Sequence, residues 1–296
     1  RSSRSMRARG QAGAMTTAPA IQVRDLRKRY GDKHAVAGLD LEVRHGEIFA
    51  VLGPNGAGKT TTVEILEGFR TRDSGEVSVL GTDPQRADRR WRSRIGIVMQ
   101  ESDDLVELTV REQIHHAARF YPAPRDPEEV ISAVGLTEKA STRVRGLSGG
   151  QRRRLDVALG VVGSPELLFL DEPTTGFDPE ARRSFWELIR SLREEGTTIL
   201  LTTHYLDEAE ALADRCAVVA EGRVVALDSP KNLGGRAERV AEVRWVEDGA
   251  PRSETSAAPT AFVAELARRF GGEVPGLQVL RPTLEDVYLS LIQEKP

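Results

Sequence analysis

The sequence predicts an α/β domain with a largely parallel sheet, followed by a small C-terminal unit. Short β-like runs alternate with helical patterns from residue 21 to about residue 227, which is typical of a sheet layered with helices. Residues 106–163 show helical patterns and little strand signal, so we expect a helical lobe inserted into the domain. Beyond Pro230, the pair Gly234-Gly235 and the Ser/Pro/Ala-rich residues 249–259 indicate a separate unit.

The expected strands and helices follow one another along the chain. Residues 46–53 form a buried strand that ends in a glycine-rich turn, and a helix starts at Lys59. In a layered α/β domain the ligand lies at the carboxyl ends of the strands. The other expected strands are residues 76–80, 95–99, 167–170, 198–201 and 217–225, the last interrupted by a hairpin turn at Glu221-Gly222. The other expected helices are residues 110–120, 127–134 and 152–162.

The chain is expected to close with an amphipathic helix. Thr283 and Asp286 form a capping pair at its start. We interpret its apolar side as a packed face, formed by Leu284, Val287, Tyr288 and Leu291.

The composition restricts the function classes. The chain has 42 basic and 45 acidic side chains and a net charge of -3, so no strong field draws it to nucleic acid or to an anionic bilayer. No apolar stretch reaches the ~20 residues that a membrane-spanning helix needs, so this sequence does not form a pore by itself. Cys216 is the only cysteine, which excludes an intramolecular disulfide and fits the cytoplasm.

The glycine-rich loop after residues 46–53 carries the strongest chemical signal. Glycines let the backbone approach phosphates closely, and the start of the following helix adds favourable partial charge. We expect Lys59 to neutralise the β- and γ-phosphates, Thr60 to coordinate Mg²⁺, and Thr61 to add a phosphate hydrogen bond. A glycine-rich turn without a ligand is the alternative, but the order of strand, loop and helix favours a nucleotide site. The motif G-x-x-x-x-G-K-[ST] consists of Gly53, Pro54, Asn55, Gly56, Ala57, Gly58, Lys59 and Thr60.

A second glycine motif indicates a family. Ser148, Gly149, Gly150 and Gln151 precede the expected helix at residues 152–162, where Ser148 can cap the helix and the glycines permit an anion to approach. Together with the phosphate loop, this motif closely resembles the signature of ABC ATPases. The resemblance implies that the motif binds the γ-phosphate of an ATP molecule held by a second copy, in a head-to-tail ATP-sandwich homodimer. A hydrolase nucleophile is the alternative, but Ser148 lacks the G-x-S-x-G elbow.

The resemblance also refines the expected fold. It implies a P-loop NTPase of the ABC ATPase type, with a RecA-like core, an antiparallel β subdomain and an inserted helical lobe, and a small C-terminal α+β extension. We expect residues 1–18 to be disordered or left over from cloning. The ATPase domain would span residues 19–230 with its helical lobe at about residues 101–163, and the accessory domain residues 231–296.

The resemblance implies further site residues. The apolar strand at residues 167–170 is followed by Asp171 and Glu172; Asp171 would bind Mg²⁺ and its water, and Glu172 would act as the general base on the attacking water. A single polar residue after a strand is more often structural, but the order and spacing here favour a site. Gln100, Asp178 and His204 match the Q-loop, the D-loop and the switch histidine, and Tyr30 matches the aromatic residue that stacks on adenine.

In that family, the Q-loop glutamine contacts Mg²⁺ or water, and the switch histidine contacts the γ-phosphate or the catalytic water. Gln100 and His204 are therefore expected to act in catalysis beside Glu172, and Gln100 also in metal binding. Asp178 is expected near the bound nucleotide.

Two basic clusters, residues 86–94 and 152–154, are interpreted as solvated faces. Acidic residues are plentiful elsewhere, and no aromatic side chains alternate with the arginines as base stacking would need. We therefore expect no nucleic-acid partner.

The tail indicates the type of ABC protein. Residues 282–289 resemble the end of ATPase subunits of drug-resistance and ABC-2-type exporters, and Phe177 stands where the family more often has leucine, which preserves apolar packing. The implied function is binding and hydrolysis of ATP with Mg²⁺, which energises export through separate membrane permease subunits of the ABC-2 type. The subunit would be cytoplasmic and associated peripherally with the inner face of the cell membrane.

Two alternatives stay open. An ATPase subunit of an ABC importer would use the same catalytic residues, usually with a different C-terminal extension. A soluble ABC ATPase acting on DNA or ribosomes usually carries paired ATPase domains or long coiled coils, whereas one signature and no sustained heptads are found here.

Overall fold

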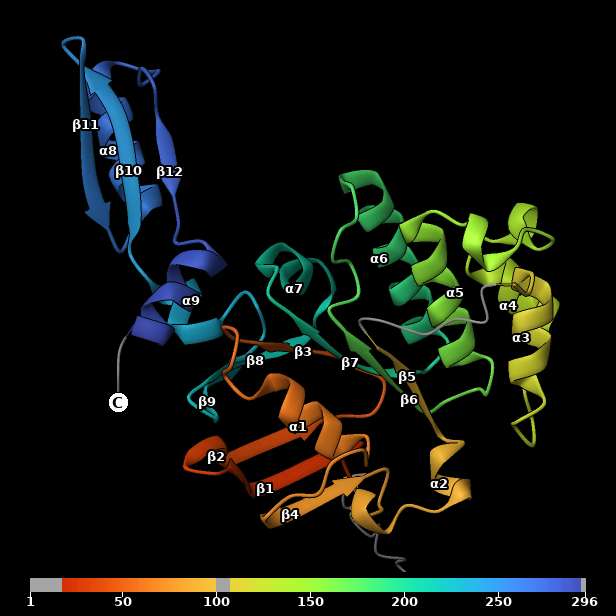
Figure 1. Cartoon of the computed structure of the whole chain (residues 1–296). Helices are drawn as coiled ribbons and strands as arrows, with labels where there is room; N and C mark the ends of the chain where they lie inside the picture. Colours follow the sequence, from red (N-terminus) through yellow and green to blue (C-terminus); the bar gives the residue numbers. More distant parts are fainter. Residues whose placement is uncertain (1–17, 100–106, 294–296) are drawn as a thin grey trace, which may run out of the picture.

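The computed structural model describes residues 18–99 and 107–293, and Figure 1 shows their arrangement. A six-stranded sheet has the order β5-β6-β7-β3-β8-β9, and two three-stranded sheets have the orders β2-β1-β4 and β11-β10-β12. Within the described ranges, no helix combines the length and the apolar character needed to cross a bilayer.

The six-stranded sheet forms the centre of the main domain. Adjacent strands from β5 to β8 pair in parallel, and only β9 is antiparallel. Because helices and the second sheet cover its two faces, its strands are almost continuous apolar runs. This arrangement confirms the expected α/β fold, and the hairpin turn at Glu221-Gly222 is also present. The strands are β3 (Ile48–Leu52), β5 (Ile95–Val98), β6 (Leu167–Asp171), β7 (Thr198–Thr203), β8 (Arg215–Ala220) and β9 (Arg223–Asp228).

One face of the central sheet packs against the antiparallel sheet. That sheet consists of β1 (Ile21–Tyr30), β2 (Lys33–Val43) and β4 (Ser74–Val79), and helix α1 (Lys59–Leu66) completes the layer. Alternate side chains of β3 serve different cores: Phe49 and Val51 pack with the antiparallel sheet, whereas its other three side chains face the helices. This is the two-residue period of a strand buried on both faces.

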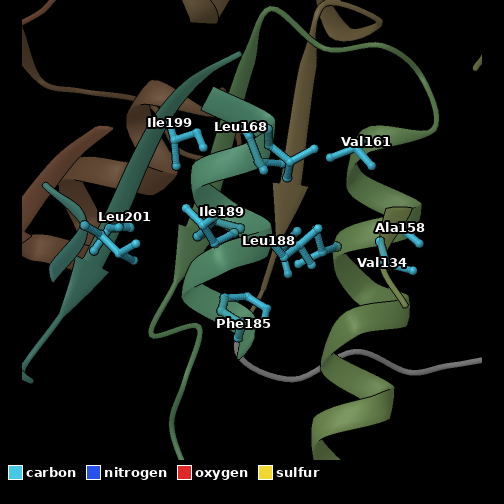
Figure 2. Close-up of a cluster of buried hydrophobic side chains, with 14 of the residues drawn as sticks. Val134, Ala158, Val161, Leu168, Phe185, Leu188, Ile189, Ile199 and Leu201 are labelled. Atoms are coloured by element: carbon cyan, nitrogen blue, oxygen red, sulfur yellow. The ribbon is translucent and has the colours of Figure 1, made fainter. Parts of the chain in front are cut away.

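The other face packs against the helical lobe and two further helices. Helices α3 (Val110–Ala118), α4 (Pro127–Ala133) and α5 (Gly149–Val161) form the lobe, and α6 (Pro179–Glu194) and α7 (Leu206–Leu212) lie beside it. Figure 2 shows one continuous core in which lobe residues such as Val134 and Val161 meet Leu168 of β6 and Leu188 of α6. The sheet and the lobe therefore share a core. The shorter helices are η1 (Pro84–Arg86), α2 (Arg89–Arg92), η2 (Thr137–Lys139), η3 (Val144–Gly146) and η4 (Leu233–Glu238).

The C-terminal sheet projects away from the main domain (Figure 1). It consists of β10 (Ala241–Glu247), β11 (Ala250–Ser256) and β12 (Gln278–Leu280). Helix α8 (Pro259–Phe270) covers one face, where Val243, Trp245, Leu266 and Val274 form a separate hydrophobic cluster. This unit has the α+β character that was expected.

The last helix returns to the main domain. Helix α9 (Leu284–Gln293) starts with the expected cap, in which the Thr283 backbone N–H donates to Asp286 (2.8 Å) and the Asp286 backbone N–H donates to the Thr283 hydroxyl (3.1 Å). Leu284 and Leu233 are both part of the main core. The domain boundary at residue 230 stays a prediction. Helix α9 lies after that boundary in sequence, yet it packs against the core of the main domain.

Candidate nucleotide-binding site

The loop between β3 and α1 needs its glycines for steric reasons. Gly53 and Gly58 have φ angles of 158° and 102°. A Cβ atom at Gly53 would lie 2.3 Å from the Val219 carbonyl oxygen, and one at Gly58 would lie 2.2 Å from the Ala35 carbonyl oxygen. No side chain fits at either position.

The β8–β9 hairpin holds this loop from outside. The Gly222 backbone N–H donates to the Ala57 carbonyl (3.0 Å), and the Gly222 carbonyl accepts from the Ala37 backbone N–H (2.9 Å). A Cβ atom at Gly222 would lie 2.9 Å from atoms of residues 35–37. The loop is thus fixed by segments distant in sequence.

Lys59 lies inside the loop. Its ammonium group donates to the carbonyl oxygens of Gly53 (2.7 Å) and Pro54 (3.2 Å), and the residue is buried. Burial lowers the pKa of Lys59, while the carboxylates of Glu172 and Asp171 oppose this shift. A buried ammonium group at the start of a helix, inside a glycine-rich loop, is suited to bind phosphate.

A pocket of about 250 Å³ brings several predicted residues together. Tyr30, which is exposed, and Glu172 both line the pocket together with residues of the loop. The lining residues are Tyr30, Lys33, Ala35, Asn55, Gly56, Gly58, Lys59, Thr60, Thr61 and Glu172.

The two acidic residues at the end of β6 are fixed by Thr202 of β7. The Thr202 hydroxyl donates to Asp171, and the Glu172 backbone N–H lies 3.1 Å from the Thr202 carbonyl oxygen and 3.2 Å from its hydroxyl. Glu172 has a φ angle of 43°, an uncommon conformation for a residue with a side chain and one that is often found at functional sites. Neighbouring contacts must therefore hold this peptide in position.

Glu172 and His204 form a pair. The His204 Nδ1 atom lies 3.2 Å from a carboxylate oxygen of Glu172, and the Thr175 hydroxyl donates to the other oxygen at 3.4 Å. The predicted base and the predicted switch histidine are therefore in contact.

A second cavity, of about 570 Å³, contains two of the predicted metal ligands. Thr60 and Asp171 both line it, with Glu67, Phe69 and Met99. Burial raises the pKa of Glu67 to about 8, and the nearby carboxylates of Asp171 and Glu64 add to the shift. Gln100, the third predicted metal ligand, lies outside the described residues.

The signature residues 148–151 lie outside the two cavities, at the start of α5. Ser148 caps α5 through a reciprocal pair, in which the Gln151 backbone N–H donates to the Ser148 hydroxyl (3.3 Å) and the Ser148 backbone N–H donates to Gln151 (3.1 Å). A Cβ atom at Gly149 would meet no described heavy atom within 4 Å, and one at Gly150 would meet only Ala181 Cβ. Neither cavity is lined by residues 148–151.

Asp178 caps α6 by accepting from the Ala181 backbone N–H (2.8 Å). It does not line either cavity. The neighbouring Phe177 ring packs edge-on against Phe185, with centroids 5.6 Å apart, so this departure from leucine preserves apolar packing as expected.

The interpretation of residues 152–154 as a solvated face is wrong for Arg153, which is only 7% exposed. Its guanidinium donates to the backbone carbonyls of Pro173 (3.1 Å), Asp171 (2.7 Å) and Met99. An arginine among like-charged neighbours gives no local signal of burial, because its acceptors are 18 to 54 residues away in sequence. The sequence also gave no indication that Thr202 holds Asp171 and Glu172, because these partners are about 30 residues away in sequence.

Together, a parallel sheet, a phosphate loop and a helical lobe with a capped glycine motif define an ATP-binding cassette. The sequence profile of the family described as "ABC transporter" matches residues 36–175. The Nod factor export ATP-binding protein I of Burkholderia orbicola is 40% identical over 299 residues, which cover 94% of this chain and 98% of that protein.

Two further proteins extend this similarity. The daunorubicin resistance ATP-binding protein DrrA2 of Streptomyces coeruleorubidus is 40% identical over 304 residues, which cover 92% of this chain and 94% of that protein. A solved ATP-binding subunit of an ABC transporter, 23% identical, has the same fold, with a TM-score of 0.68 over 92% of this chain and 99% of the other. The chain belongs to the ABC transporter family as an ATP-binding, ATP-hydrolysing subunit.

Proposed function

We propose that the chain hydrolyses ATP with Mg²⁺ in the pocket beside the phosphate loop and thereby drives export through separate membrane permease subunits. The position of Glu172 is the main support for ATP hydrolysis at this site. Glu172 lines the same pocket as the phosphate loop and contacts His204 at 3.2 Å. The export part is supported by two relatives that are named for export and for drug resistance.

ATP would lie with its phosphates on the loop and its adenine beside Tyr30. The backbone N–H groups of the loop and the ammonium of Lys59 supply the positive potential. Tyr30 is 42% exposed, and an accessible aromatic side chain at this place can stack on a base.

Thr60 and Asp171 would hold Mg²⁺. Both line one cavity, and hydroxyl and carboxylate oxygens are suitable Mg²⁺ ligands that leave room for phosphate oxygens and water. The metal would neutralise the charge that develops on the phosphates. Gln100 is proposed as a further ligand from its match to the Q-loop.

Glu172 would take a proton from the attacking water. Its carboxylate is sheltered, with 17% of the side chain exposed, and Thr202 fixes its backbone. His204 and Thr175 each contact one carboxylate oxygen of Glu172, at 3.2 and 3.4 Å, and so orient the base toward the water. His204 can also hydrogen-bond the γ-phosphate or the water.

A second copy of the chain would complete the site. The backbone at Gly149 is open to approach, since a Cβ atom there would meet no heavy atom of the described residues within 4 Å. This openness supports contact between the start of α5, including Ser148 to Gln151, and the γ-phosphate of ATP on a partner subunit, with Asp178 close to the same interface.

The permease would be of the ABC-2 type, and the subunit would be attached at the cytoplasmic face of the membrane. The resemblance of residues 282–289 to ABC-2-type exporter subunits supports this proposal, and so does the similarity to DrrA2 over 92% of the chain. An importer ATPase and a soluble ATPase acting on DNA or ribosomes are the competing functions.

The function can be tested in membrane vesicles that contain the chain and the permease that co-purifies with it. Daunorubicin, named in one relative, is the first probe. We expect ATP-dependent accumulation in inside-out vesicles and none with Glu172→Gln. Accumulation only in right-side-out vesicles would support import. ATPase stimulation by DNA or ribosomes, without any response to a membrane partner, would support the soluble alternative.

A further inference from the structure

Arg153 links three segments of the chain through one guanidinium group. Its Nε atom donates to the Pro173 carbonyl (3.1 Å), one terminal nitrogen donates to the Asp171 carbonyl (2.7 Å), and the other donates to the Met99 carbonyl. The Asp156 carboxylate is 3.8 Å away on the same helix. An arginine can do this because its donors form a rigid planar fork, whereas lysine has a single compact ammonium group.

The acceptors of these bonds lie around the proposed catalytic base. Asp171 and Pro173 are the residues immediately before and after Glu172, so Arg153 bonds to backbone carbonyl groups on both sides of the base. Glu172 has a φ angle of 43°, and such a conformation persists only where surrounding contacts enforce it. The third acceptor, Met99, follows β5 and directly precedes Gln100.

The position of Arg153 in α5 connects this clamp to the signature. Arg153 lies two residues after Gln151, within the first turns of the helix that Ser148 caps. A helix moves as a rigid element over such a distance. A displacement at the start of α5 therefore reaches the backbone on both sides of Glu172 through hydrogen bonds of Arg153.

We infer that Arg153 is a positioning residue that couples the signature helix α5 to the catalytic base of the same subunit. The inference rests on the proposed function, in which the start of α5 contacts the ATP of a partner subunit. ATP bound in one site then fixes α5, and α5 fixes Glu172 in the other site. The two ATP sites of the dimer thereby communicate, and hydrolysis is cooperative.

The test compares Arg153→Met and Arg153→Lys with Arg154→Met in the full-length chain. Arg154 is a matched control, because it is the next residue of α5 and donates to the Val134 carbonyl (2.8 Å) and to the Ser184 hydroxyl. Nucleotide affinity, kcat, KM, the Hill coefficient for ATP and the thermal midpoint are measured for each variant.

We expect kcat to fall about 10- to 100-fold in Arg153→Met, since a displacement of about 1 Å at a reacting group can cost about 10²-fold in rate. ATP affinity should change little, and the Hill coefficient should fall toward 1. Arg153→Lys should also lose kcat, because one ammonium cannot reach all three carbonyls. Arg154→Met should lower the thermal midpoint while leaving kcat and the Hill coefficient close to the wild-type values.

Wild-type kcat and cooperativity in a folded Arg153→Lys or Arg153→Met would overturn the inference. Equal losses of kcat in Arg153→Met and Arg154→Met would also overturn it, because the effect would then be one of general stability. Glu172→Gln separates this inference from the proposed function. If Glu172→Gln hydrolyses ATP normally, the site assignment fails, whereas an inactive Glu172→Gln beside a fully active Arg153→Met refutes only the role of Arg153.

Discussion

Glu172→Gln is the perturbation that most directly probes the proposed chemistry. The amide keeps the size and planarity of the carboxylate but cannot accept a proton from water at neutral pH. The backbone contacts of residue 172 to Thr202, at 3.1 and 3.2 Å, do not involve the side chain. The unusual backbone conformation should therefore persist, and the variant should fold normally.

The expected loss follows from the role of the side chain. General-base assistance contributes roughly 10²–10⁴ in rate, which corresponds to about 2.7–5.4 kcal/mol of activation free energy at about 1.36 kcal/mol per factor of ten. Lys59, Thr60 and Asp171 are unchanged in the variant and would still hold the nucleotide and Mg²⁺. Hydrolysis should therefore fail while binding persists, and the ATP-bound dimer should accumulate.

Three measurements check this expectation. Phosphate release gives turnover, a fluorescent nucleotide gives affinity, and size-exclusion chromatography with light scattering, in the presence of ATP and Mg²⁺, gives the oligomeric state. Normal turnover by folded Glu172→Gln would refute the catalytic assignment. A monomer at saturating ATP would refute closure by this subunit alone.

Three further predictions concern the loop, the second cavity and the tail. Lys59→Ala should weaken ATP binding about 10- to 100-fold, because a hydrogen bond to a charged group is worth about 1.5–3 kcal/mol; unchanged affinity, measured by calorimetry, would exclude Lys59 from the site. The raised pKa of Glu67, about 8, means that its contribution to stability is fully present below its unfolded pKa and is lost as the pH rises through about 8. Thermal melts of Glu67→Gln should therefore show a smaller fall in the midpoint between about pH 5 and about pH 9 than the wild type, and an equal fall would contradict this. Replacing residues 241–280 by a short Gly/Ser linker should preserve nucleotide binding and the thermal midpoint, because Glu242 and Leu280 are paired and the removed unit has its own core. Deleting residues 231–296 should instead lower the midpoint, because it removes Leu284 from the main core and such a loss costs about 2–5 kcal/mol; equal midpoints for the two deletions would show that α9 does not stabilise the domain.

Local patterns were sufficient to predict the central part of the fold. The buried strand at β3, the phosphate loop and the start of α1 follow from residues adjacent in sequence, and so do the Ser148 cap and the final helix. These features depend on periodicity, glycine conformations and short-range hydrogen bonds, all of which are encoded locally.

Contacts between distant segments could not be predicted in this way. Nothing near Arg153 in sequence indicates that carbonyls at the ends of β5 and β6 will surround it. The apolar face of α9 was predictable, whereas the surface that it covers was not, because that surface belongs to the main domain. The roles of Gln100, Asp178 and the signature residues stay predictions, since they depend on a bound nucleotide and on a second subunit.

The contact between the β8–β9 hairpin and the phosphate loop has a consequence for protein engineering. A two-residue turn such as Glu221-Gly222 is an attractive point for inserting a fluorescent label or an affinity tag, because tight surface turns usually tolerate insertions. Here the Gly222 backbone bonds to Ala57 and Ala37, and the space for a Cβ atom is occupied by the backbone of residues 35–37. An insertion there would displace the support of the loop. The exposed β10–β11 turn at Asp248-Gly249 belongs to the separate C-terminal sheet and is the better choice for such a reporter.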